Sequence, residues 1–122
     1  MPYDWGPHFI VPSDLLRNFS GVVLLREELE EELLEKELEC LGLSGPVIRI
    51  TNPWYFRRKG EESWIKAGES DDIRNNFPVR WDTRPLQDGR YEILGIMHVI
   101  IKTAGEEKVI ARQNIVEVNV EN

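Results

Sequence analysis

The sequence has one cysteine and two histidines, and these scarcities narrow the chemistry that the chain can support. Cys40 alone excludes an internal disulfide and any metal site built from several cysteines. A hydrolytic triad needs a nucleophile, a histidine and a carboxylate. His8 lies among the N-terminal residues and His98 lies inside an apolar run, where a structural role is more frequent than a catalytic one. We therefore expect no enzymatic activity, no cofactor and no bound metal.

Long hydrophobic runs and an excess of basic residues are also missing. No apolar segment is long enough to cross a bilayer, so we expect no membrane insertion. The formal net charge of −7 argues against nucleic acid as a partner, because binding to phosphates depends on Lys and Arg. The N-terminus lacks the basic and apolar regions of a secretory signal, which favours a cytoplasmic protein or a segment excised from a larger one.

What the 122 residues do contain is a series of short β patterns, enough for one domain. Residues 1–8 are predicted to form an irregular arm, whose Tyr3 and Trp5 either pack against the body or are exposed to a partner. Residues 9–122 are predicted to form a mainly β domain of about seven strands. The strand patterns cover residues 9–11, 20–25, 47–58, 63–67, 77–82, 91–103 and 108–120.

Residues 26–41 differ from the rest, because eight of the sixteen are Glu and five are Leu. The leucines fall at helical spacing and predict an inserted, acidic amphipathic helix with one apolar stripe. They are Leu29, Leu33, Leu34, Leu38 and Leu41. Gly42 is predicted to end the helix, and the acidic face is predicted to be solvated. A helix that pairs with a coiled-coil partner, or a strand over part of the segment, is the alternative.

The most specific pattern spans residues 77–91. The dipeptide Asp88-Gly89 signals a turn, and Leu86, Gly89 and Tyr91 have the spacing of a tyrosine corner. This corner resembles that of immunoglobulin-like and fibronectin type III-like domains. The longer string that begins at Trp81-Asp82-Thr83 and ends at Tyr91 resembles the signature of bacterial immunoglobulin-like modules.

The resemblance implies an immunoglobulin-like antiparallel β-sandwich, in which the hydroxyl of Tyr91 bonds to upstream backbone and Trp54 is the core tryptophan. It also favours a cell-surface or secreted location, in contrast to the missing secretory signal. Two features depart from the family: there is no pair of cysteines, and the acidic segment at residues 26–41 is longer than the usual link between the second and third strands.

Two sets of residues are candidates for binding. Tyr55, Arg57 and Trp64 are predicted to point outward from a hairpin. Leu94, Ile96 and Ile100 make a second apolar face on the strand at 91–103, and a strand that is apolar on both faces is normally covered on both. We expect the helix at 26–41 to cover this second face, or the face to be an oligomer or partner interface.

These features favour a non-enzymatic interaction or structural module that binds a protein partner or self-associates. The alternative is a carbohydrate-binding accessory module of a larger surface or secreted protein, which would use Tyr55, Trp64 and neighbouring arginines.

Overall fold

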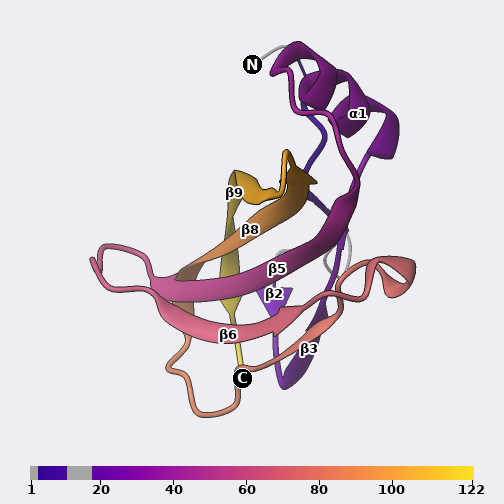
Figure 1. Cartoon of the computed structure of the whole chain (residues 1–122). Helices are drawn as coiled ribbons and strands as arrows, with labels where there is room; N and C mark the ends of the chain where they lie inside the picture. The colour runs from indigo at the N-terminus through magenta and orange to yellow at the C-terminus, as the bar shows by residue number, and fades with distance from the viewer. Residues whose placement is uncertain (1–2, 11–17) are drawn as a thin grey trace.

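The computed structural model describes residues 3–10 and 18–122, and in these ranges it shows a mainly β protein with one α-helix (Figure 1). The elements in chain order are β1 His8–Phe9, β2 Asn18–Phe19, β3 Val22–Leu25, β4 Glu27–Glu28, α1 Glu31–Cys40, β5 Val47–Arg58, β6 Ile65–Ser70, the 3-10 helix η1 Ile73–Asn75, β7 Val79–Asp82, β8 Gly89–Thr103 and β9 Glu106–Val120. In these ranges there are two strands more than the seven predicted, because β2 and β4 are two-residue segments that the sequence patterns did not indicate.

A curled mixed sheet, with the strand order β2-β9-β8-β5-β6, forms the body of the molecule. The strands β8 and β9 pair along their whole length, from Gly89 opposite Val120 to Thr103 opposite Glu106. The tight turn between them needs left-handed backbone, which Ala104 and Gly105 adopt. The pairing of β2 with β9 is parallel, whereas the other pairs in this sheet are antiparallel.

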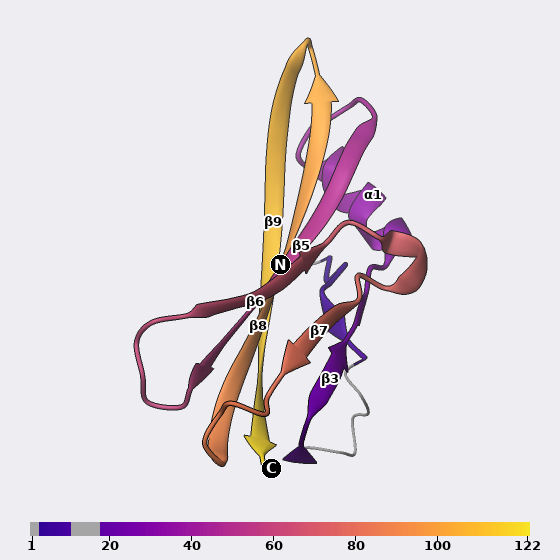
Figure 2. The same ribbon diagram turned by 90° about the horizontal axis from the view of Figure 1, so that it is seen from below.

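Two elements cover the same face of this main sheet. The antiparallel pair β3–β7 lies over one end and α1 lies over the other, and both are to the right of β8 and β9 in Figure 2. The interior accordingly has two clusters. The strand core includes Leu25, Trp54, Trp81, Tyr91 and Ile93. The helix core comprises Trp5, Leu34, Leu38, Phe77, Met97, Val99 and Ile101.

The acidic segment is helical over Glu31–Cys40, so the predicted helix is confirmed but begins five residues later than expected. Residues 27 and 28 instead form β4, which pairs with β1. The chain leaves the helix at Gly42, whose φ of 70° allows the amide of Leu43 to donate to the carbonyl of Leu38 at 2.9 Å. Leu34 and Leu38 are buried, whereas Leu41 lies beyond the helix and is 52% exposed.

The predicted position of the helix is wrong. We expected it to cover Leu94, Ile96 and Ile100, but it packs on Met97, Val99 and Ile101. These residues alternate with the first set along β8 and therefore lie on the opposite face of the sheet. The acidic side of the segment is also less solvated than predicted, because Glu27 and Glu37 are buried.

Two other predictions shift at their boundaries. The strand predicted at 77–82 begins at Val79, because Asn76 and Phe77 have left-handed backbone with φ of 61° and 52°. Phe77 instead turns into the helix core. The N-terminal arm packs against the body, since Trp5 is fully buried there. Val11, in the strand predicted at 9–11, falls outside the described residues.

Candidate functional site

The outer face of the main sheet is the side away from α1 and β3–β7. Because side chains alternate along a strand, β8 directs to this face the residues that lie between its core residues. They are Glu92, Leu94, Ile96, His98, Ile100 and Lys102. None of the described elements packs over this face, and neither Leu94 nor Ile100 belongs to the strand core or the helix core.

The pairing register places apolar side chains in rows across the outer face. One row runs from Tyr55 on β5 through Leu94 to Ile115 on β9. Their neighbours in the sheet shield Leu94 and Ile100, which are 6% and 9% exposed.

The predicted set missed two exposed large apolar residues of this face. Val109 pairs with Ile100, and Val109 and Ile115 are 57% and 43% exposed. The signal for them was present in the sequence, since Val109, Ala111, Gln113 and Ile115 share one parity of the last strand.

Charged residues frame these apolar rows, with opposite signs on the two flanking strands. On β5 the outer positions include Arg49 and Arg57, with Lys59 just beyond the strand, whereas on β9 they include Glu107 and Glu117. Within the chain, Arg57 pairs with Glu92 at 3.0 Å, and Glu117 pairs with Lys59 at 2.9 Å and with Arg90 at 3.3 Å. The hydrogen bond from Lys59 lowers the pKa of Glu117.

The two aromatic residues predicted to form a binding pair, Tyr55 and Trp64, make different contacts. The guanidinium carbon of Arg57 lies 4.1 Å from the centre of the Trp64 ring, so Arg57 covers one face of the half-buried indole. Tyr55 instead belongs to the row with Leu94, on the outer face. Arg57 and Trp64 are thus brought together, while Tyr55 contributes to the apolar surface.

The corner at residues 81–91 has the geometry that the resemblance implies. The hydroxyl of Tyr91 donates to the carbonyl oxygen of Gln87 at 2.8 Å. The rings of Trp81 and Tyr91 meet edge to face with centroids 6.3 Å apart, and Leu86 packs beside them. Gly89 supplies the turn with a φ of 146°, which residues with a side chain rarely adopt.

We expect Tyr91→Phe to lower the free energy of unfolding by about 1 kcal/mol, because the substitution removes a partly buried hydrogen bond and leaves the Gln87 carbonyl without that donor. Urea denaturation followed by tryptophan fluorescence measures the change. Tyr55→Phe, on the open outer face, is the matched control and should alter stability much less. Equal effects of the two substitutions would contradict a structural role for the corner bond.

A carboxyl group is buried in the interior where β3 passes into β4. Glu27 and Asn52 are both fully buried. The carboxylate lies directly over Gly95, at which a Cβ atom would come within 2.6 Å of Oε2 of Glu27. Burial raises the pKa of Glu27 to about 9, although the neighbouring Asn52 amide opposes the shift. No hydrogen bond of ordinary geometry joins the two side chains. Glu27 is therefore an uncharged carboxylic acid at neutral pH.

A second buried glutamate ties three parts of the chain together. Glu37 on α1 accepts hydrogen bonds from the indole nitrogen of Trp5 and from Nη2 of Arg112 on β9, the latter at 2.7 Å. Burial alone would raise the pKa of Glu37, but these two donors outweigh it and the pKa is lowered. Glu37 is therefore charged, and it holds the N-terminal arm and the helix against the main sheet.

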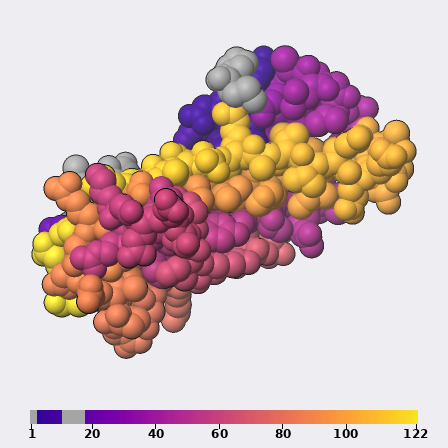
Figure 3. Space-filling view, turned by 90° about the vertical axis from the view of Figure 1, so that its left-hand side faces the viewer, coloured from indigo at the N-terminus to yellow at the C-terminus, as the bar shows by residue number. Residues whose placement is uncertain are grey.

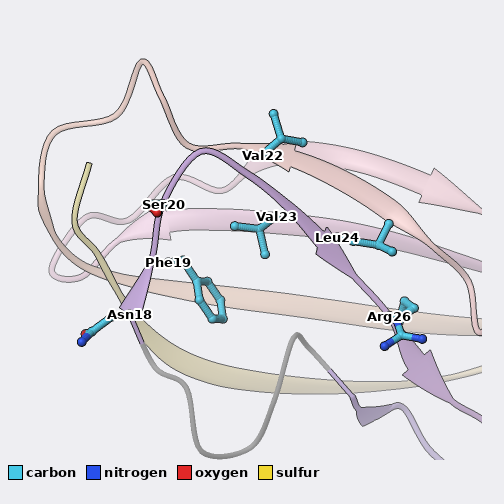
Figure 4. A pocket seen from close by; sticks show the side chains of 7 residues that line it. All are labelled: Asn18, Phe19, Ser20, Val22, Val23, Leu24 and Arg26. Carbon is cyan, nitrogen blue, oxygen red and sulfur yellow. The ribbon is translucent and has the colours of Figure 1, made fainter.

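A shallow groove beside β2 and β3 is another surface feature (Figure 4). Its volume is about 330 Å³. It is lined by Asn18, Phe19, Ser20, Val22, Val23, Leu24 and Arg26. Val22 and Leu24 are half exposed there. The lining lacks a histidine or a carboxylate and so offers no acid or base for catalysis.

In the part of the chain that the structure describes, no group of three or more His, Cys, Asp or Glu side chains is arranged to hold a metal ion. Among the same residues, α1 is too short and too polar to span a bilayer. The chain matches no known protein family, no curated protein and no solved structure.

Proposed function

We propose that this chain is an immunoglobulin-like β-sandwich module. Immunoglobulin-like domains pair their second and fifth strands in one sheet and place the third, sixth and seventh in the other. The pair β3–β7 facing the order β9-β8-β5-β6 has this arrangement. The bond from Tyr91 to Gln87 and the full burial of Trp54 on β5 also support the assignment. The helix α1 then occupies the connection between the second and third strands.

We further propose that the module is non-enzymatic and binds protein through the outer face of the main sheet. The supporting observation is that the helix covers the inner face, while none of the elements formed by residues 3–10 and 18–122 lies over the apolar rows of the outer face. Exposed apolar surface rimmed by charge is typical of protein contacts. Here the row of the exposed Val109 ends at Arg49, and the row next to that of Ile115 carries Arg57 and Glu117.

The geometry does not favour the carbohydrate-binding alternative. Sugar rings stack on open aromatic faces, but the guanidinium of Arg57 occupies one face of Trp64. Tyr55 lies in the adjacent row of the same face, beside Leu94, where it adds to the apolar surface.

A photo-reactive side chain at position 115 tests the outer face as a protein contact. We expect it to form protein adducts in extracts of the source cells. The matched control places the same group at Ile65, which is 56% exposed but lies on the same side of the sheet as Phe56, away from the outer face. Denaturing electrophoresis and mass spectrometry compare the two positions. Adducts of equal yield at both positions, or none at position 115, would count against the proposed surface.

A further inference from the structure

Building on the proposed function, we infer that the occupant of the outer face is a second copy of this chain, related to the first by a twofold axis parallel to β8. Such an axis packs the two outer faces against each other with their strands aligned, as in sandwich packing. It places β5 of one copy over β9 of the other, so that every row of one face meets the same row of its partner. The apolar rows then bury each other.

The charges on the flanking strands select this axis. The row that contains Arg57 on β5 contains Glu117 on β9. The axis therefore sets Arg57 of each copy against Glu117 of the other, and the contact occurs twice. At the opposite end of the face, Arg49 on β5 approaches the β9 strand that carries Glu107. Basic β5 and acidic β9 therefore attract each other along both edges, which outweighs the two like-charge contacts on the axis, where Glu92 and Lys102 of β8 each meet the same residue of the other copy.

The other face-to-face arrangement brings like charges together at the edges of the interface. A twofold axis perpendicular to the strands, in the plane of the sheet, would place β5 over β5 and β9 over β9. Arg57 of one copy would then lie near Arg49 of the other and Glu117 near Glu107, while on β8 only Glu92 and Lys102 would attract each other. Like charges would meet at both edges of the interface, which opposes association.

The apolar part of the face suits a partner of the same shape. The row of Tyr55, Leu94 and Ile115 and the row of Ile100 and Val109 lie between the charged ends. Figure 3 shows the β8–β9 hairpin as a long orange-to-yellow ridge, with α1 and the N-terminal residues on only one side of its far end. The ridge runs along the strand direction, where the partner's hairpin would lie.

Charge reversal tests the axis directly. Sedimentation equilibrium at low ionic strength should show a dimer for the native chain. The variants Arg57→Glu and Glu117→Arg should each dimerise about tenfold or more weakly, since each places like charges together twice. An equimolar mixture of the two variants should recover a heterodimer, because Glu at 57 in one chain meets Arg at 117 in the other. The mixture also controls for the internal ion pairs with Glu92 and Lys59, which are lost in the variants alone and in the mixture alike.

Each failure has a distinct meaning. A native chain that stays monomeric overturns the self-association and leaves the photo-crosslinking at position 115 to decide whether the face binds another protein. A native dimer that Arg57→Glu strengthens, or a mixture that remains monomeric, overturns the parallel axis. Should the charge variants fail to fold, Val109→Arg tests the same interface at an exposed position, with Ile65→Lys as control. Dimerisation unchanged by Val109→Arg overturns the inference.

Discussion

Glu27→Gln is expected to flatten the dependence of stability on pH between about pH 4.5 and pH 9. The folded state keeps a proton on Glu27 up to a pKa of about 9, whereas the unfolded chain releases it near the ordinary value of 4.5. Between these values the folded state holds one more proton than the unfolded state. Its free energy of unfolding therefore falls as the pH rises, by up to about 1.4 kcal/mol per pH unit from this group.

Denaturation curves at a series of pH values measure this slope. The stabilising contribution of protonated Glu27 is fully present below pH 4.5 and is lost as the pH rises through 9. Glu28→Gln is the matched control, because the neighbouring carboxylate is exposed and its replacement should leave the slope unchanged. A native protein whose stability is independent of pH over this range, or parallel slopes for Glu27→Gln and the native chain, would show that Glu27 is ionised inside the fold.

Glu37→Ala is expected to lower the free energy of unfolding by about 2 kcal/mol or more, because it removes the acceptor for both Arg112 and Trp5. Breaking a buried ion pair from one side leaves the other charge without compensation. The loss should be smaller than for a wholly enclosed pair, since the side chain of Arg112 retains 17% exposure. Guanidinium denaturation measures the change, and Glu35→Ala on the exposed side of α1 controls for helix propensity.

The double variant Glu37→Leu with Arg112→Leu separates the charge from the packing. It should recover part of the lost stability, because apolar replacement of a whole buried pair is often neutral.

The pH dependence of stability that Glu37 contributes has the opposite sign to that of Glu27. The interactions that lower the pKa of Glu37 stabilise the fold at pH values above the ordinary pKa of a glutamate. This stabilisation is lost as the pH falls through the pKa of Glu37 in the folded state. Equal losses of unfolding free energy for Glu37→Ala and Glu35→Ala would show that the contacts of Glu37 with Arg112 and Trp5 do not stabilise the fold.

Local patterns predicted much of this fold. Alternation along 91–103 and 108–120 indicated the long hairpin, and the leucine spacing indicated α1, since both depend on periods that are written into neighbouring residues. The positions of Leu86, Gly89 and Tyr91 pointed to the corner, because its turn and its hydrogen bond join residues close in the chain.

Local patterns could not show which face each element covers. The alternation of β8 is apolar on both sides, and we assigned the helix to the face of Leu94, whereas it covers the face of Met97. The choice depends on Trp5 and Phe77, which come from distant loops to complete the helix core. Glu27 and Glu37 were likewise indistinguishable from the solvated glutamates around them. Their burial follows from Gly95, which leaves room for one carboxylate, and from Arg112, which neutralises the other.

The parallel contact of β2 with the end of β9 joins residues 18 and 19 to residues 119 and 120. Val118 and Val120 are also part of the strand core, together with Phe19 from β2. During synthesis on the ribosome, neither the main sheet nor the strand core can close until residue 120 has emerged from the exit tunnel. Until then Trp54 and Trp81 lack part of their apolar surroundings, and exposed apolar surface of this kind favours association of incomplete chains.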